Sequence, residues 1–460
     1  MNQIFTNKDY KYTLGKEWVL RDDSEYMNKY SALNINTGQI LYLNQPLFAF
    51  LKIMSTNSLS FNQITEMFRQ KDINFDWKHF FDIYKKNNPI NLLIPSTIPY
   101  QEKYQKYNID THGLSAPVAS TPFDAEIHLT HKCNLRCLHC FQESDAKSNK
   151  FSHLSLEKWL DIFDQFEQMK MFQITISGGE PLYYKYFNEL MEEIIKKKLC
   201  YNILTNGTLI SEKNIQLLSS PNIFLNISLD GHNANLHDSL RGKGTFSRTE
   251  NAIKKLLNHD AKINISYTVH KENYQHIRDM VIYAVKMNIK SITFSAIDAM
   301  GRAELNNRLL LSAKEYKQIK ENIENLNLEF GEKIKLSFVN LSEPGSITNL
   351  STDYIYCSAG TRRIAISANG ILYPCVYGFG HEELAIGDIK EKSIIDCWVD
   401  YEKWANYRGK IKLQNLEKCG GCSLKQKCTL KFCRLKGYEK EKNFLAKPKN
   451  CLADRIYQLQ

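Results

Sequence analysis

The sequence predicts an α/β protein whose centre is a partial (β/α)6 TIM-like barrel, with a winged-helix domain before it and a cysteine-rich domain after it. Three observations support this prediction. The chain has 460 residues, and domains usually contain about 100 to 200 residues, so two to four domains are expected. Strand and helix patterns alternate between residues 125 and 297. The 12 cysteines fall mainly in two separate regions, which indicates two sites of metal chemistry.

Residues 1–97 have the pattern of a small winged-helix domain. Residues 30–44 read as two short strands joined by a turn at Asn36-Thr37-Gly38. Apolar residues recur at helical spacing at 46–54, 62–68 and 77–84. Residues 98–122 are rich in Ser, Thr, Pro, Tyr and Gln, which predicts a linker.

The predicted barrel domain spans residues 123–335, and the C-terminal domain spans 336–460. Candidate strands lie at 125–130, 172–177, 201–205, 223–229, 263–269 and 291–297, with helical patterns between them. One of these helices is predicted after Ser155, its candidate N-cap, with Leu156, Trp159, Leu160, Phe163 and Phe166 on a single face. Repeated strand–helix units predict a parallel sheet with right-handed crossovers. Active-site motifs should then directly follow strands, at their C-terminal ends.

Composition excludes several functional classes. No apolar run approaches the roughly 18 residues that a membrane span needs, and the N-terminus lacks the apolar segment of a signal peptide. We therefore expect a cytoplasmic protein without a membrane span, whose cysteines bind metals rather than form disulfides. The net charge of +10 is concentrated in 401–460, but no long basic run or interleaved aromatic stripe indicates nucleic-acid binding.

A loop with three cysteines follows the first predicted strand. Cys133, Cys137 and Cys140 have the spacing Cys-x3-Cys-x2-Cys. Three thiolates can hold three irons of a [4Fe-4S] cluster and leave the fourth iron open for a substrate. The alternative is a structural zinc site completed by His131 or His139, in a zinc-binding scaffold. Zinc knuckles usually pair cysteines from two loops, so the single loop favours the cluster.

This cysteine spacing, with His139 at the usual aromatic position before the last cysteine, resembles the signature of the radical S-adenosylmethionine (SAM) superfamily. The resemblance implies that SAM binds the open iron. One electron, from an external flavodoxin- or ferredoxin-type reductant, would split SAM into methionine and a 5'-deoxyadenosyl radical that abstracts hydrogen from a substrate. The protein's part would be orientation and the exclusion of side reactions.

The ends of the next strands then supply candidate SAM contacts. Two glycines after the second strand let the backbone approach a ligand closely, and the resemblance places the methionine amino group of SAM there. Residues after the third strand look like ribose contacts, and an arginine further along could bind the SAM carboxylate as a bidentate fork. The simpler alternatives are Asx turns and a surface arginine. The candidates are Gly178, Gly179, Glu180, Thr205, Asn206, Ser228, Asp230 and Arg241.

The C-terminal region contains a second series of cysteines. They are Cys357, Cys375, Cys419, Cys422, Cys428, Cys433 and Cys451. Their order resembles the SPASM extension of radical SAM maturases, except that four residues rather than three precede Cys433.

The SPASM resemblance implies two auxiliary [4Fe-4S] clusters. One would be held by Cys419, Cys422, Cys428 and Cys451. The other would be held by Cys357, Cys375 and Cys433, with a fourth iron that is open or bound by a neighbour such as Cys397. A zinc ribbon is the alternative for Cys419 and Cys422 alone. Cys200 and Cys397 otherwise read as ordinary buried residues.

The N-terminal region resembles the PqqD-like recognition element of peptide-modifying maturases. An exposed strand edge there could bind the leader of a precursor peptide by strand addition. Together the three regions resemble the sactipeptide maturases, which implies that the enzyme installs thioether crosslinks in a ribosomally synthesised peptide. The alternatives are a carbon–carbon crosslinking maturase and an anaerobic sulfatase maturase. The sequence assigns no catalytic side chain.

Overall fold

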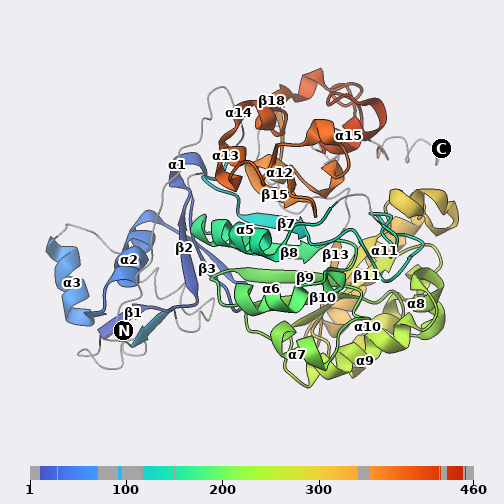
Figure 1. The fold of residues 1–460 in the computed structure, drawn as a ribbon, viewed down its shortest axis with the longest axis horizontal. Helices are drawn as coiled ribbons and strands as arrows, with labels where there is room; N and C mark the ends of the chain where they lie inside the picture. The colour runs from blue at the N-terminus through green and yellow to red at the C-terminus, as the bar shows by residue number, and fades with distance from the viewer. Residues whose placement is uncertain are drawn as a thin grey trace.

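The computed structural model describes residues 11–27, 29–70, 92–95, 116, 118–148, 152–339, 353–423, 425, 433–448 and 451. Figure 1 shows a central barrel with an N-terminal domain at one end of its strands and a C-terminal domain along one side. The predicted helix at 77–84 and most of the predicted linker lie outside the described residues. Among the described residues, no helix is both long and apolar enough to span a membrane.

The described part of the N-terminal domain contains two small antiparallel sheets and three helices. One sheet has the order β2 (Trp18–Asp22), β3 (Tyr30–Asn34) and β4 (Ile40–Leu43), and the other has the order β5 (Leu59–Ser60), β1 (Lys11–Leu14) and β6 (Leu93–Pro95). The helices are α1 (Ser24–Met27), α2 (Gln45–Thr56) and α3 (Phe61–Gln70). The β3–β4 hairpin was predicted. Its turn is held by Asn34, whose Oδ1 accepts from the amides of Asn36 and Thr37.

The barrel consists of seven adjacent parallel strands. In spatial order they are β7 (Asp124–His128), β8 (Gln173–Ser177), β9 (Cys200–Thr205), β10 (Ile223–Ser228), β11 (Ile263–Val269), β12 (Ser291–Ala296) and β13 (Lys335–Val339). The first six are confirmed predictions, and β13 was not predicted. This is the expected partial barrel, extended by one strand.

Helices cover the outside of the barrel. They are α5 (Leu156–Gln168), α6 (Phe187–Ile194), α7 (Glu212–Leu218), α8 (Ala234–Arg241), α9 (Thr245–Leu257), α10 (Ile277–Lys286) and α11 (Ala313–Phe330). The predicted N-cap of α5 is present, because the Ser155 side chain accepts from the amide of Lys158. Trp159, Phe163 and Phe166 of its predicted face are fully buried in the core between helices and sheet.

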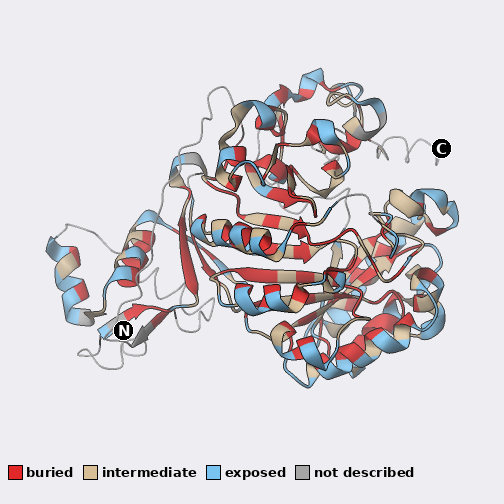
Figure 2. Ribbon diagram, viewed as in Figure 1, coloured by how far each residue is buried: buried red, intermediate tan, exposed pale blue. Residues whose placement is uncertain are grey.

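The two faces of the barrel strands differ in chemistry. Buried and partly exposed residues alternate along the central strands (Figure 2). Apolar residues such as Ile227 and Ile265 face the helices, whereas Asn226 and Asn264 face the interior. The interiors of closed barrels are normally filled by bulky branched side chains. In this barrel the interior positions are largely polar and retain accessible surface.

The C-terminal domain continues the barrel sheet. Strand β15 (Arg362–Ile366) pairs in parallel with β7, and β16 (Ile371–Tyr373) and β17 (Gly387–Asp388) extend the sheet in antiparallel fashion. Strands β14 (Tyr354–Cys357) and β18 (Arg408–Lys412) form a separate pair. The described α-helices are α12 (Ser358–Thr361), α13 (Ile394–Val399), α14 (Tyr401–Trp404) and α15 (Arg434–Glu441). The domain is therefore joined to the barrel by backbone hydrogen bonds.

Short 3-10 helices complete the described elements. In the barrel domain they are η1 (Pro181–Tyr183), η2 (Tyr274–His276), η3 (Gly301–Leu305) and η4 (Asn307–Leu309). In the C-terminal domain they are η5 (Val376–Gly378), η6 (Glu382–Leu384), η7 (Ala405–Tyr407) and η8 (Leu413–Asn415).

The N-terminal domain covers the N-terminal ends of the barrel strands. Val19 and Leu33 pack against Phe172 and Cys200, which lie at or next to the starts of β8 and β9. The contact also contains a buried cation, since the Arg21 guanidinium donates to the carbonyl of Pro122 at 2.8 Å and pairs with Asp23 at 2.6 Å. The domain thus lies at the end of the barrel opposite to the end where the strand-following motifs gather.

Candidate iron–sulfur and SAM site

The predicted cluster loop begins at His131, three residues after the end of β7. Two of its three thiols are buried. Cys133 and Cys137 are buried and Cys140 is half-buried, and the three side chains pack together around Leu135. Burial, together with the nearby Glu180 carboxylate and the other two thiols, raises the pKa of the Cys133 thiol to about 12, against the lowering effect of a hydrogen bond from the Leu135 amide. Such thiols ionise when a metal ion binds them. The donor set therefore fits a [4Fe-4S] cluster.

Arg302 and Gly301 of η3 hold this loop in place. The Arg302 guanidinium donates to the carbonyls of Cys137 and Ser144, each at 2.8 Å, and its amide donates to the carbonyl of Cys140 at 3.0 Å. Gly301 has φ +55°, and a Cβ there would lie 2.5 Å from the Cys140 carbonyl oxygen. The sequence did not identify this support, because it comes from a segment more than 150 residues away.

Gly178 and Gly179 follow β8, as the sequence predicts. The structure gives a more specific reason why both positions require glycine. Their amide groups lie directly against the cysteine loop: a Cβ on Gly178 would be 2.4 Å from the Thr130 carbonyl oxygen, and one on Gly179 would be 2.3 Å from that of Lys132. Only glycine allows this close approach. The two glycines thus dock the end of β8 onto the cysteine loop and still line the cavity described below.

Glu180 connects the second and third strand ends. Its carboxylate accepts from the Thr205 hydroxyl at 2.6 Å and from the Asn206 amide at 2.8 Å. The Asn206 side-chain amide in turn donates to Asn134 of the cysteine loop and to the Cys133 sulfur. Burial raises the pKa of Glu180 to about 7, against the lowering effect of these hydrogen bonds. Glu180, Thr205 and Asn206 thus form one network around the first thiol.

Asp230 and Arg241 form a buried ion pair beside the cysteine loop. The Arg241 Nε lies 2.5 Å from Asp230 Oδ2, and the other Asp230 oxygen accepts from the Thr268 amide at 2.7 Å. Burial alone would raise the pKa of Asp230, but the Arg241 guanidinium holds it below its usual range. Burial and Arg241 also lower the pKa of His139 to about 3. The structure thus excludes the alternative of a surface arginine.

These groups surround one cavity of about 360 Å³, which we call the upper cavity. Its lining includes the three thiols and all but one of the predicted SAM contacts: Cys133, Cys137, Cys140, Gly178, Gly179, Glu180, Thr205, Asn206, Ser228 and Arg241. Asp230 is the exception, since it is fully buried behind Arg241. Binding pockets for small molecules have volumes of this order, and the polar lining fits a charged nucleoside such as SAM.

Side chains of the C-terminal domain close over this cavity. Val376 lines it, the ring of Tyr377 contacts Phe141 edge-on at 5.2 Å, and Phe379 contacts His128 at 4.6 Å. Lys436 of α15 reaches Asp298, just after β12, at 2.5 Å. None of these contacts was predicted, because each pairs residues that are distant in the sequence.

Three of the predicted C-terminal ligands gather in the structure. Burial and the nearby thiols of Cys433 and Cys357 raise the pKa of Cys375 well above its usual value. Cys357 ends β14, Cys375 follows β16 and Cys433 precedes α15. This grouping agrees with the set that the resemblance implies for one auxiliary cluster.

The other predicted ligands are described only in part. Cys419 and Cys422 lie on one turn, where the Cys422 amide donates to the Cys419 carbonyl. Cys451 is half-buried, and Cys428 lies outside the described residues. Cys397 is buried in the apolar core beside Gly387, and Cys200 packs in the N-terminal domain contact.

Comparison with known proteins identifies the class. Residues 127–284 match the Radical SAM superfamily, and residues 357–423 match the SPASM iron-sulfur cluster-binding domain. The chain therefore contains a radical SAM domain and a SPASM domain, and SAM and [4Fe-4S] clusters are confirmed as its cofactors. Which cysteines hold each cluster remains a prediction.

Particular relatives narrow the class. The chain is 27% identical to the antilisterial bacteriocin subtilosin biosynthesis protein AlbA of Bacillus subtilis. The aligned region of 351 residues covers 74% of each of the two chains. It is 28% identical to the mycofactocin maturase MftC of Mycolicibacterium smegmatis, over 67% of this chain and 76% of the relative. The structure of Streptococcus suis SuiB bound to S-adenosylmethionine matches with a TM-score of 0.69 at 17% identity, over 95% of this chain and 99% of SuiB.

Proposed function

We propose that this enzyme is a peptide maturase that installs thioether crosslinks in a ribosomally synthesised precursor peptide. The observation that carries the proposal is that a residue adjacent in sequence to one of the C-terminal thiols lines the upper cavity. Val376 lines the cavity and directly follows Cys375, which lies near Cys357 and Cys433. A site that activates a carbon is thereby next to one that can bind sulfur.

The relatives support a peptide substrate. AlbA is named for the biosynthesis of the bacteriocin subtilosin, the sporulation killing factor maturation protein SkfB is another relative, and SuiB has also been solved with its precursor peptide SuiA. The N-terminal domain of this chain would bind a leader. Strand β4 pairs only with β3 among the described strands, and its Ile40 and Tyr42 side chains are exposed, so its free edge can accept an added strand.

The residues of the site have distinct proposed roles. Cys133, Cys137 and Cys140 would hold the cluster that SAM binds, and the segment Gly178–Glu180 would face the SAM amino group. Thr205 and Asn206 would position this segment, since both are hydrogen-bonded to Glu180. Ser228 and Arg241 would contact the rest of SAM, and Asp230 would orient Arg241. Cys357, Cys375 and Cys433 would hold one auxiliary cluster, and Cys419, Cys422, Cys428 and Cys451 the other.

The cofactors, when bound, supply radical hydrogen abstraction and one-electron transfer. In the net reaction one C–H bond and one S–H bond of the peptide would break and one C–S bond would form, so the peptide would lose two hydrogens. One hydrogen atom would go to 5'-deoxyadenosine, the thiol proton would be released, and the remaining electron would pass to an auxiliary cluster. Closure by Val376, Tyr377 and Phe379 would keep water and other hydrogen donors away from the reacting carbon. An external flavodoxin- or ferredoxin-type protein would supply the reducing electron.

The test is reconstitution under anaerobic conditions with SAM, dithionite and the short cysteine-containing peptides encoded near the gene. We expect 5'-deoxyadenosine and a peptide product that is lighter by two hydrogens per crosslink. Alkylation with iodoacetamide distinguishes the products, because a thioether consumes a free thiol and a carbon–carbon crosslink does not. A product that keeps all its free thiols would contradict thioether formation, and formylglycine would indicate a sulfatase maturase.

A further inference from the structure

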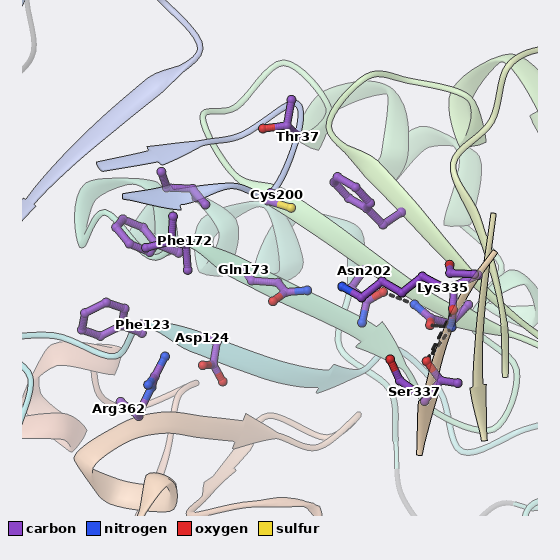
Figure 3. Close-up of a pocket in the computed structure, with 18 residues that line it drawn as sticks. Thr37, Phe123, Asp124, Phe172, Gln173, Cys200, Asn202, Lys335, Ser337 and Arg362 are labelled. Carbon is purple, nitrogen blue, oxygen red and sulfur yellow. Dashed lines mark hydrogen bonds between the residues drawn. The ribbon is translucent and has the colours of Figure 1, made fainter. Parts of the chain in front are cut away.

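Two groups of polar side chains lie outside the upper cavity. The first lines a cavity of about 430 Å³ at the N-terminal ends of the barrel strands. Figure 3 shows Gln173 and Asn202 in this cavity, with Asp124 at one side and Lys335 at the other. Among the described residues that line it there is no histidine and a single carboxylate, that of Asp124, which pairs with Arg363. This cavity therefore lacks a set of metal ligands.

Two histidines and an aspartate come together at the opposite end of the barrel. His232 lies in the loop between β10 and α8, His276 is the last residue of η2, and Asp279 lies in the first turn of α10. One nitrogen of each imidazole and one carboxylate oxygen all lie within 4.8 Å of one another. These three residues are not part of the upper-cavity lining. We call them the His–His–Asp group.

Hydrogen bonds between two loops position the histidines of this group. The Asn273 side chain is fully buried and donates to the carbonyls of Asp230 at 3.1 Å and Thr268 at 2.9 Å. The His276 amide in turn donates to the Asn273 carbonyl at 2.9 Å. These bonds join the loop after β10 to the loop after β11, and the ring centroids of His232 and His276 are 5.7 Å apart. Buried contacts therefore set the arrangement of the two histidines in the absence of a metal.

The distances within the group are close to those of a metal site. Nitrogen and oxygen atoms that bind one tetrahedral zinc ion, each at about 2.0–2.1 Å, lie about 3.3 Å from one another. His276 Nδ1 is 3.0 Å from Asp279 Oδ2, so an ion can replace the hydrogen that the two atoms share. The His232 nitrogen is within 4.8 Å of the other two atoms. Small rotations of the exposed Asp279 and of the partly exposed histidines close this gap.

His232 has a ring nitrogen without a partner. Its Nδ1 is buried and has no hydrogen-bond partner among the described residues, and a buried polar atom left in this state is costly. Its Nε2 lies 2.9 Å from the side-chain nitrogen of Asn233. A metal on Nδ1 requires the ring hydrogen on Nε2, so the Asn233 amide nitrogen moves away from Nε2 when an ion binds. The ion then supplies the partner that Nδ1 lacks.

We propose that the His–His–Asp group binds a zinc ion, with water as the fourth ligand. Imidazole nitrogens and a carboxylate oxygen are usual zinc ligands, and three protein ligands leave one position for water. The ion links the loop after β10 to the start of α10. Asp230, the partner of Arg241, lies two residues before His232, so the ion also stiffens the support of the proposed SAM site. This inference is independent of the proposed peptide substrate.

Equilibrium dialysis of the untagged holoenzyme against ZnCl2 under anaerobic conditions tests the site, with elemental analysis of zinc and iron. The wild type should bind about one zinc per chain at this site, and its iron content should not change. His232→Ala and Asp279→Ala should each weaken this binding at least about tenfold, since even residues behind the ligands contribute that much. His259→Ala, at an exposed histidine after α9, is the matched control and should bind zinc as the wild type does.

X-ray absorption at the zinc edge distinguishes this site from the cysteines. The His–His–Asp group gives nitrogen and oxygen neighbours at about 2.0–2.1 Å, whereas thiolates give sulfur neighbours at about 2.3 Å. Sulfur as the main neighbour, or equal zinc affinity of the wild type and Asp279→Ala, would overturn the proposal, as would a wild type that binds no zinc. Asp279 is exposed, so its variant should fold normally, and circular dichroism checks this for both variants.

Discussion

A buried ion pair at the site, Asp230 with Arg241, determines how these two residues can be changed. Asp230 is fully buried, and the Arg241 side chain is 9% exposed. Each charge is stable in the interior because the other neutralises it. The pair fixes the end of β10 to the last turn of α8, beside the cysteine loop. The Asp230–Arg241 pair therefore maintains the shape of the proposed SAM site, in addition to any contact that Arg241 makes with SAM.

The first prediction concerns this pair. Arg241→Gln should lower the free energy of unfolding by about 3–5 kcal/mol, because it leaves the Asp230 carboxylate buried without a cation. The double variant Asp230→Asn/Arg241→Gln should recover part of this loss. Urea denaturation under anaerobic conditions measures both. Equal stability of the single variant and wild type would show that the pair is not formed in solution.

The second prediction concerns the cluster ligands. Cys133→Ser should remove one four-iron cluster, so the iron content should fall from about 12 to about 8 atoms per chain. Cleavage of SAM should be lost with it. Cys200→Ser is the matched control, since Cys200 is buried against the N-terminal domain, and it should retain all the iron. Unchanged iron in Cys133→Ser would refute the assignment of this loop.

The sequence predicted these residues unevenly, for a physical reason. Functional cysteines and glycines can be recognised from their spacing in the sequence, so the cysteine loop and Gly178–Gly179 were identified. Arg302 and the Lys436–Asp298 pair were not, because an arginine or lysine contributes through a partner that only folding brings near. The glycine before Arg302 was the one local signal available.

At the scale of elements, the junction between α8 and α9 depends on one carboxylate. Asp238 accepts from the amides of Gly244 and Phe246, at 2.6 and 2.8 Å, and from the Thr245 hydroxyl at 3.0 Å. Burial alone would raise the pKa of Asp238, but these hydrogen bonds lower it. The carboxylate thus caps the start of α9 and fixes the direction of α8, which carries Arg241.

The third prediction follows from this cap. Asp238→Ala should cost about 1–2 kcal/mol of stability at pH 7. Because the folded-state pKa is below the unfolded value, the difference from wild type should be complete above about pH 4 and should disappear as the pH falls through the folded-state pKa. Chemical denaturation across this pH range measures it. Glu192→Ala, at an exposed position of α6, is the control.

The strands illustrate what a sequence pattern can and cannot determine. Six barrel strands were predicted, because each alternates with a helix and has buried apolar residues. Strand β15 was not, since its partner β7 lies more than 230 residues earlier and no local pattern reports such a pairing. The polar inner face of the barrel could have been predicted from the sequence. Apolar and polar residues alternate within INISYTV and SITFSA, which indicates strands with one apolar and one polar face.

At the scale of the whole molecule, Arg21 couples the N-terminal domain to the barrel. Its guanidinium is buried and also donates to the carbonyls of Thr121 and Lys170. The guanidinium carbon lies over the Phe123 ring, 3.9 Å from the ring centroid. A cation with this many partners is costly to remove. It fixes the position of β4 relative to the barrel, on which delivery of a peptide would depend.

The fourth prediction tests this coupling. Arg21→Ala should destabilise the domain contact by about 3–5 kcal/mol, because Asp23 loses its buried partner. Hydrogen exchange should increase in β2 and at the start of β8, while the amides of β11 and β12 should remain protected. Lys16→Ala, a change of an exposed side chain, is the control. An unchanged exchange pattern in Arg21→Ala would show that the apolar contacts suffice.

The pairing of β15 with β7 also has a consequence for biosynthesis. Strand β7 carries the cysteine loop, and its second neighbour is made only when residues 362–366 have left the ribosome. Until then β7 is an unpaired sheet edge, and long-range pairings of this kind form slowly. The sheet around the cysteine loop can therefore be completed only after most of the chain has been synthesised. We expect the first cluster to be inserted into full-length chains, and truncation before residue 362 should yield protein that aggregates.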